Sequence, residues 1–519
     1  AMRPSFNTSG PCFADEHYML PPERRLGEVM ELIDEHKFFT FTAGRQTGKT
    51  TSGMWIEEHL NKTGAWRALW VDIQTSRQQP DLTDAFRALL SKIDEVCGIV
   101  HPDVTRPNIE ELLRSPARAV GQYLAFLAGQ GDRPWVILFD EADCLVGNAM
   151  VSFLTQLRDG YISRRRVPFP ASVVLIGQRQ VRDYALREED WRTLTWLGTT
   201  SPFNITAQPM TLGPFTEPEV RELLEQHTAK TGQRFEPEAI ARIYELGQGH
   251  PWLTNAMADQ IVRRDVKDRA VAITVDHVDA AKETIIIERR THIDSLMAKL
   301  REERVRKVLD PLLAGDSLPD DVLNDDIAYL IGLGLVRAVK RGGGLEIANP
   351  VYREVIPRAL NYVQQISLRV PSPWYVKPNG SLDMGKLMAD WQVFWRKDGH
   401  LAAEGFFYRE SGPHLMLMAF LQRIINGGGR IEREYGLGRG ALDILVCWKE
   451  ERHAIELKIR RDMDTETEAL EQIVRYLDEL GLSEGWLVMF DLRKELSWQD
   501  KQFVREVQHN GKLVRFVGC

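Results

Sequence analysis

The sequence predicts a multidomain α/β protein whose N-terminal part is built on a parallel sheet. Short apolar strands near residues 38–42, 68–73, 135–139 and 173–177 alternate with amphipathic helices, which is typical of a parallel sheet covered by helices. The chain has 519 residues, more than one hydrophobic core usually organises, so we expect about three or four domains. After residue 214 the pattern turns helical, and strands return near the C-terminus.

The composition is that of a soluble globular protein. Hydrophobic residues make up 43% and charged residues 27% of the chain, without low-complexity tracts. No apolar run approaches the roughly 20 residues that span a bilayer, and the N-terminus has no signal-peptide pattern, so we expect a cytoplasmic protein without membrane contact. The five cysteines are scattered and form no CxxC pair, which argues against a zinc site or a disulfide framework.

The formal net charge of −8 gives no general attraction to nucleic acid, so any such binding must be local. Basic residues gather in three places: Arg164, Arg165 and Arg166; Arg301, Arg304, Arg306 and Lys307; and Arg337, Lys340 and Arg341. Each could contact nucleic acid, but charge runs are more often solvated faces, and both alternatives stay open.

The first chemical motif follows the strand at 38–42. It is a glycine-containing turn ending in Gly-Lys-Thr, made of Ala43, Gly44, Arg45, Gln46, Thr47, Gly48, Lys49, Thr50 and Thr51. In such a loop the backbone N–H groups converge on nucleotide phosphates, Lys49 would pair with the β- and γ-phosphates, and the Thr50 hydroxyl would bind Mg²⁺. Ala43 replaces the first glycine of the strict pattern. A chance Gly-Lys-Thr is the alternative. We predict that the loop binds ATP.

A second motif supports this prediction. The apolar strand at 135–139 ends in Asp140 and Glu141. Asp140 would hold the water shell of Mg²⁺, and Glu141 would orient and deprotonate the attacking water. The alternative is a core strand that ends in two acids by chance. The strand at 173–177 is followed by Gln178, which could sense the γ-phosphate because carboxyl ends of parallel strands meet at one edge; a surface turn is its alternative.

The next segment predicts helices. Thr216-Glu217-Pro218-Glu219 is typical of a capped helix start, and Gly249-His250-Pro251 follows further helical sequence. Through these features, together with residues 201–205 and 212–217, the first 290 residues resemble the STAND and archaeal-ATPase branch of the AAA+ superfamily. The resemblance implies a small helical lid that brings Pro251 near the nucleotide. A homo-oligomer formed on ATP binding is one possibility, and the oligomeric state stays open. The resemblance leaves the arginine finger unassigned among Arg179, Arg182 and Arg192.

Residues 291–365 indicate a winged helix. Helical sequence is followed by residues 327–336 and a hairpin around Arg341-Gly342-Gly343-Gly344, so the wing is basic. In the ATPase branch that the chain resembles, such a domain is a regulatory packing module as often as a DNA reader. Residues 366–400 are rich in proline and glycine and predict a linker.

The C-terminal part carries a second chemistry. One predicted strand, 441–448, holds Asp443, and its hairpin partner, 454–459, holds Glu456 and Lys458 two residues apart on one face. Two carboxylates and a lysine at a strand bend can hold one or two Mg²⁺ ions and assist water attack on a phosphodiester. An ordinary surface salt bridge is the alternative.

This trio resembles the PD-(D/E)XK nuclease motif, with Leu442 where the leading proline usually stands. A predicted helix from Glu466 carries Gln472 and Tyr476, similar to the Gln-xxx-Tyr element of RecB-like members. The resemblance also implies a helix at 414–425, a strand at 485–490 and a further metal-binding glutamate, for which Glu404 and Glu410 are candidates.

The predicted organisation is an N-terminal leader (1–25), a P-loop ATPase core (26–215), a helical lid (216–290), a winged helix (291–365), a linker (366–400) and a nuclease-like domain (401–519). We predict an ATP-regulated nuclease that uses ATP and Mg²⁺, with Mn²⁺ as an alternative ion at the nuclease site. DNA is favoured over RNA as substrate, and the architecture suggests genome or phage defence. The alternative is a STAND-type signalling or scaffold ATPase whose C-terminal domain binds nucleic acid or a partner without cutting.

Overall fold

The computed structural model divides the chain into two compact units. One comprises residues 1–287 with 328–335, and the other 288–327 with 336–519. The structure describes residues 4–44, 46–76, 79, 81–145, 147–177, 210–288, 296, 298–313, 318, 325–339, 344–367, 375–399, 411–426, 430–437, 440–460, 465–493 and 495–519.

The first unit is built on a five-stranded sheet of order β2-β3-β4-β1-β5. All its pairs are parallel, and β4 lies between β1 and β3. The strands are β1 (Phe38–Thr42), β2 (Arg67–Asp72), β3 (Trp135–Asp140), β4 (Ser172–Gly177) and β5 (Met210–Thr211). The expected parallel α/β sheet is confirmed, with the four expected strands correct to about one residue. The short β5 was not expected.

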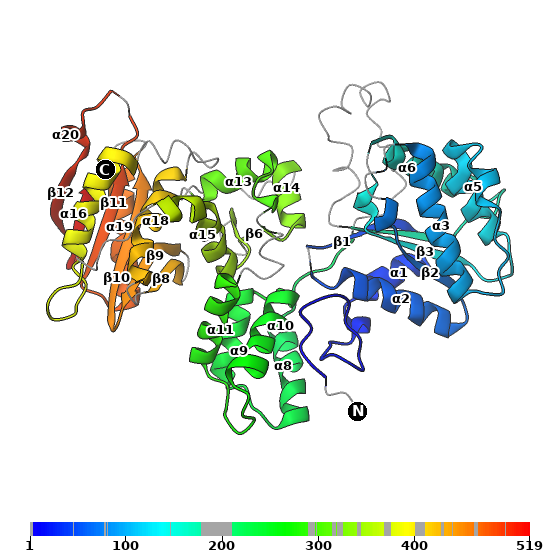
Figure 1. Cartoon of the computed structure of the whole chain (residues 1–519), viewed down its shortest axis with the longest axis horizontal. Helices are drawn as coiled ribbons and strands as arrows, with labels where there is room; N and C mark the ends of the chain where they lie inside the picture. Colours follow the sequence, from blue (N-terminus) through cyan, green and yellow to red (C-terminus); the bar gives the residue numbers. More distant parts are fainter. Residues whose placement is uncertain are drawn as a thin grey trace. The chain divides into compact units, whose positions relative to one another are not determined.

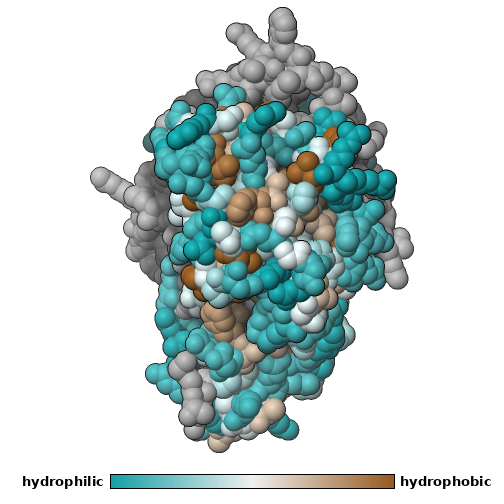
Figure 2. Space-filling view, turned by 90° about the vertical axis from the view of Figure 1, so that its right-hand side faces the viewer, coloured by the Kyte–Doolittle hydropathy of each residue, from teal (hydrophilic) through white to brown (hydrophobic). Residues whose placement is uncertain are grey.

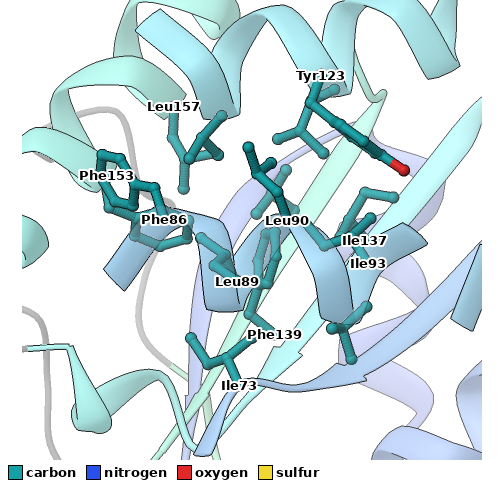
Figure 3. Packing of buried hydrophobic residues seen from close by; sticks show 14 of the residues in the cluster. Ile73, Phe86, Leu89, Leu90, Ile93, Tyr123, Ile137, Phe139, Phe153 and Leu157 are labelled. Atoms are coloured by element: carbon teal, nitrogen blue, oxygen red, sulfur yellow. The ribbon is translucent and has the colours of Figure 1, made fainter. Parts of the chain in front are cut away.

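Helices cover both faces of this sheet, which explains why its central strands are almost continuously apolar (Figure 1). Successive β3 residues alternate between the faces: Ile137 and Phe139 pack with α3, α5 and α6, whereas Val136 and Leu138 pack on the side of α1 and α2 (Figure 3). The elements are α1 (Gly27–Asp34), α2 (Lys49–Thr63), α3 (Leu82–Val100), α4 (Ile109–Leu112), α5 (Pro116–Ala128) and α6 (Gly147–Ser163), with short 3₁₀ turns η1 (Pro22–Arg24), η2 (Gln74–Ser76) and η3 (Ala142–Cys144).

A helical segment completes the first unit. It comprises α8 (Glu217–Thr231), α9 (Pro237–Gly247), α10 (Pro251–Gln260), a π-helical turn η5 (Ile261–Asp265) and α11 (Val275–Ile287). Thr216 and Glu219 form a reciprocal capping box at the start of α8, as the sequence predicted. Prolines stand in the first turn of α8, α9 and α10, where a missing N–H costs no helical hydrogen bond.

The turn between α9 and α10 requires a glycine at position 249. Gly249 has φ +74°, and a Cβ there would lie 1.8 Å from the Phe215 carbonyl oxygen. The two residues are also joined by a hydrogen bond, since the Phe215 N–H donates to the Gly249 carbonyl at 2.8 Å. The turn is therefore held against the chain that enters α8, and no side chain fits between them.

Gly249→Ala is expected to loosen this turn, with local destabilisation of about 1–3 kcal/mol from the strained backbone. Hydrogen exchange of the α9 and α10 amides should become faster. Gly247→Ala is the matched control, because its Cβ would meet Leu253 and Met257 atoms at an ordinary 3.5 Å. Equal exchange rates in the two variants would contradict this account of the turn.

The second unit begins with helices and a small hairpin. Strands β6 (Val336–Ala338) and β7 (Leu345–Ile347) pair antiparallel, with Val336 opposite Ile347. The helical elements are α13 (Glu303–Leu313), α15 (Pro350–Ser367), α16 (Met384–Phe394), a π-helical turn η6 (Trp395–Gly399) and α18 (Gly412–Asn426), while α14 (Asp325–Gly332) spans the division between the units.

A six-stranded sheet of order β12-β13-β11-β10-β9-β8 forms the C-terminal part. The pairs β10–β11 and β11–β13 are parallel and the others antiparallel. The elements are β8 (Arg430–Leu437), β9 (Gly440–Trp448), β10 (Glu451–Ile459), α19 (Thr465–Leu480), β11 (Glu484–Phe490), α20 (Trp498–Lys501), β12 (Phe503–His509) and β13 (Lys512–Gly518). Helix α19 packs on one face of this sheet. The rings of Trp391 and Trp395 pack on Phe490.

The surface shown in Figure 2 is mainly hydrophilic, interrupted by small hydrophobic areas. Large apolar side chains such as Ile99 and Ile162 are exposed singly on different helices, which is normal for globular proteins. Within the described ranges, every helix is too short or too polar to cross a bilayer.

Candidate functional site

The Gly-Lys-Thr loop joins β1 to α2 through an unusual backbone. Gln46 has φ +57° and Gly48 φ +96°, and Gly48 caps α2. Two left-handed residues turn the chain sharply, so the first N–H groups of α2 face the loop. The Thr47 hydroxyl closes the turn by donating to the Gly44 carbonyl at 2.7 Å. The geometry suits an anion at the positive end of the helix. Arg45 lies outside the described residues.

Lys49 reaches back over this loop. Its ammonium donates to the Ala43 carbonyl at 2.9 Å and to the Gly44 carbonyl at 2.8 Å. The side chain is buried, so its positive charge stays beside the loop. An incoming phosphate would offer the ammonium a charged acceptor, which binds more strongly than a neutral carbonyl.

Thr50 and Asp140 meet at the carboxyl edge of the sheet. The Thr50 hydroxyl donates to Asp140 Oδ2 at 2.8 Å, and the Glu141 N–H donates to Asp140 Oδ1 at 2.9 Å. Burial raises the pKa of Asp140, while these two hydrogen bonds and the Lys49 charge oppose the rise. A divalent cation bound between Thr50 and Asp140 would favour the carboxylate further. Among the described residues no group of three or more His, Cys, Asp or Glu forms a metal cluster by itself.

Glu141 has a strained backbone. Its φ of +55° is uncommon for a residue other than glycine. The Cys144 N–H and Sγ both donate to the Glu141 carbonyl, at 2.9 and 2.8 Å, so the following turn η3 holds this conformation. Strain retained immediately after Asp140 is consistent with a functional position.

The sequence suggested four residues as sensors or arginine fingers that lie outside the described residues: Gln178, Arg179, Arg182 and Arg192.

Residues 4–26 form a strap that joins the Gly-Lys-Thr loop to the helical segment. The Cys12 N–H donates to the Thr51 hydroxyl at 2.9 Å, so Thr51 contacts the strap. The Trp252 indole N–H donates to the Thr8 carbonyl at 2.9 Å. Tyr18 Oη lies 3.2 Å from Nδ1 of the buried His227. The sequence indicated only a leader here, because no local pattern marks a segment whose contacts are so distant along the chain.

The strap, the loop and the helical segment enclose a cavity of about 140 Å³, which we call the loop cavity. Its lining is mixed: Gln46, Thr47 and Gly48 come from the loop, and apolar side chains come from the strap and helices. Pro251 also lines it, so the structure brings this predicted residue to the loop. The loop cavity therefore adjoins the Gly-Lys-Thr loop and combines polar and apolar lining residues, as ligand sites commonly do.

His250 precedes Pro251 and caps α10. Its Nδ1 accepts a hydrogen bond from the Leu253 N–H at 3.4 Å, so Nε2 carries the proton when the ring is neutral. Burial, and then the positive charge of Lys49, lower the pKa of His250 to about 4. The ring is therefore neutral at physiological pH and adds no positive charge beside Lys49.

The C-terminal sheet holds a buried carboxylate beside a lysine. Glu456 in β10 is fully buried, and the Lys458 ammonium lies 3.2 Å from Glu456 Oε1. Because side chains alternate along a strand, both share the face of Ala454, which packs in the hydrophobic cluster formed with α19. The structure thus brings Glu456 and Lys458 together on the face that α19 covers.

Asp443 lies on the neighbouring strand β9. The antiparallel register pairs Ile444 with Ile455. The next positions beyond this pair are Asp443 on β9 and Glu456 on β10, so these two residues are neighbours across the strands. The side chain of Asp443 is outside the described part.

On α19 the Gln472 amide donates to the Tyr476 hydroxyl at 3.1 Å, so these two predicted residues contact each other. Glu404 and Glu410 lie outside the described residues.

Several residues of the predicted basic patches are paired with acids. Arg304 lies 3.0 Å from Asp326, Lys307 3.1 Å from Glu303, and Arg337 2.6 Å from Glu346. Lys340 and Arg341 lie outside the described residues. The pairing favours a charged, solvated face over a dedicated phosphate-binding surface at these three positions.

Comparison with solved structures finds remote similarity to several proteins. The Walker-type ATPase PABY2304 of Pyrococcus abyssi is 16% identical over 69% of this chain and 99% of its own, with a TM-score of 0.47. The RuvB Holliday junction branch migration motor of Thermotoga maritima is 14% identical over 64% and 93%, with a TM-score of 0.33. Cdc6p of Pyrobaculum aerophilum is 13% identical over 68% and 96%, with a TM-score of 0.35.

No protein-family model matches the sequence, and no curated protein matches it either. The structural similarities are too low to indicate function. The fold and the candidate sites therefore rest on the strand order, contacts and burial described above.

Proposed function

We propose that the first unit binds and hydrolyses ATP with Mg²⁺. The observation that carries this proposal is the meeting of Thr50, Asp140 and Lys49 at the start of α2: a hydroxyl and a carboxylate 2.8 Å apart, beside a buried ammonium. Thr50 and Asp140 would hold Mg²⁺ directly or through water, while Lys49 would bind the β- and γ-phosphates. Glu141, next to Asp140, would orient the attacking water.

We further propose that the C-terminal domain, residues 401–519, is a metal-dependent nuclease. A fully buried carboxylate is costly unless a cation or hydrogen bonds compensate it, and Lys458 supplies one cation beside Glu456. Asp443 and Glu456 would hold Mg²⁺ or Mn²⁺, and Lys458 would stabilise the negative charge of the transition state. Gln472 and Tyr476 would contact the nucleic acid backbone. DNA is the favoured substrate, in the cytoplasm and in a defence role.

The two activities would be coupled. In this proposal residues 26–215 form the ATPase core, 216–290 its lid, 291–365 a winged helix and 366–400 a linker to the nuclease-like domain. The strap supports this proposal because it contacts both the loop and α10. Through these contacts, nucleotide occupancy would bias the position of the lid. ATP-dependent assembly into a homo-oligomer would follow from the same lid movement. Only contacts that differ between the ATP-bound and ATP-free states can transmit the effect of ATP binding to the nuclease-like domain.

ATP is expected to raise the DNA cleavage rate by between about 5- and 150-fold, the usual range for coupling between two sites. Cleavage is measured for wild type, Lys49→Ala and Glu141→Gln with ATP, ADP and no nucleotide, at saturating Mg²⁺. Glu141→Gln should stay active in ATP because it retains the nucleotide, whereas Lys49→Ala should remain at the basal rate. Equal rates in all conditions would refute the coupling. The absence of cleavage by any protein would instead favour a scaffold ATPase.

A further inference from the structure

Asn255 on α10 presents a buried hydrogen-bond acceptor at the loop cavity. The residue is 7% exposed and lines the cavity together with Pro251, which lies one helical turn earlier. The Asn255 side-chain amide donates from Nδ2 to the Pro251 carbonyl at 2.9 Å. A carbonyl can only accept, so the NH₂ end of the amide must face it and Oδ1 must point away. The orientation of the amide is thereby fixed by its own helix.

Asn255 Oδ1 is buried and has no hydrogen-bond partner among the described residues. Buried acceptors are nearly always paired, and an exception is a candidate for a ligand contact. The cavity that Asn255 lines also has apolar walls, with Leu20, Leu212 and Trp252 among them, beside polar residues such as Ser9 and Arg25. A flat heteroaromatic ring with one polar edge suits such a compartment.

We propose that Asn255 selects adenine nucleotides, its Oδ1 accepting a hydrogen bond from the exocyclic amino group of the base. The proposal rests on the proposed ATP function, since the loop fixes the phosphates beside this cavity. Guanine carries a carbonyl oxygen at the corresponding ring position. That oxygen would oppose the Asn255 oxygen, and two facing acceptors repel each other. Asn255 therefore acts as a specificity residue that does not touch the phosphates.

The test compares three triphosphates that share the sugar and phosphates and differ in the base: ATP, GTP and purine riboside triphosphate, which lacks the amino group. Binding is measured by calorimetry with Mg²⁺. Wild type should bind ATP about 3- to 10-fold more tightly than purine riboside triphosphate, the value of one neutral hydrogen bond, and GTP more weakly still. In Asn255→Leu, ATP should bind no better than purine riboside triphosphate, whose own affinity should change by less than about two-fold.

One control separates recognition from packing. Thr254→Val removes a neighbouring buried hydroxyl that is not part of the cavity wall and should leave all three affinities in the wild-type order.

The outcomes distinguish this inference from the function on which it rests. If wild type binds none of the three triphosphates, the ATP function itself is refuted. If it binds ATP, GTP and purine riboside triphosphate equally, the ATP function stands and the role of Asn255 is refuted, without any variant having to fold. An equal loss for all three ligands in Asn255→Leu would also overturn the proposal, because that pattern indicates general damage to the cavity.

Discussion

Lys49→Ala is expected to weaken ATP binding by roughly 100-fold or more, because it removes charge-assisted hydrogen bonds to two phosphates. Calorimetric titration with ATP and Mg²⁺ measures the loss. The matched control is Lys62→Ala, since Lys62 lies on the same helix but is exposed and pairs with Glu58 at 2.6 Å. That variant should bind like wild type. Unchanged ATP affinity in Lys49→Ala would show that the loop does not hold the phosphates.

Glu141→Gln provides the contrast to this variant. The amide keeps the shape of the side chain but cannot accept a proton, so ATP binding should persist while hydrolysis falls by about 100-fold or more. The pair of variants thus separates binding from turnover. Normal hydrolysis in Glu141→Gln would remove Glu141 from the role of base and leave its strained backbone without a catalytic explanation.

Glu456→Gln is expected to reduce metal-dependent DNA cleavage by roughly 1000-fold, because the neutral amide is a poor ligand for Mg²⁺. Glutamine is nearly isosteric, so the buried site should keep its packing. Asp443→Ala should lose cleavage for the same reason. Lys458→Ala should also lose cleavage but still bind Mn²⁺, since a lysine is no metal ligand. Calorimetric Mn²⁺ titration and cleavage of single- and double-stranded DNA and of RNA measure these effects, with ATP hydrolysis unchanged throughout.

Lys512→Ala is the control for these variants, because it breaks an ion pair with the exposed Asp478 in the same domain, where the ammonium lies 2.9 Å from the carboxylate. It should cut like wild type. If Glu456→Gln cuts as fast as wild type, the catalytic site has been placed wrongly. If wild type neither binds Mn²⁺ nor cuts any substrate, the Glu456–Lys458 pair is a structural ion pair.

Local patterns in the sequence determined several elements of this protein. Apolar runs bounded by polar residues marked β1, β3 and β4, and the Thr216–Glu219 capping box marked the start of α8. Alternation along one strand also put Glu456 and Lys458 on a common face. These features depend on residues that are close together in the sequence, within about one or two helical turns. Their physical causes can therefore be inferred from spacing and residue type.

Only the tertiary structure decided which distant residues meet. The strap contacts Thr51 and Trp252, which lie 39 and 244 residues from their partners Cys12 and Thr8, and no periodicity encodes such pairs. The full burial of Glu456 likewise depends on α19 covering its strand. The orientation of the Asn255 side-chain amide depends on its hydrogen bond to the Pro251 carbonyl, one turn earlier in α10. Hydrophobic packing sets these contacts without regard to sequence distance, which is why the sequence by itself could name the loop and the acids but not the cavity between them.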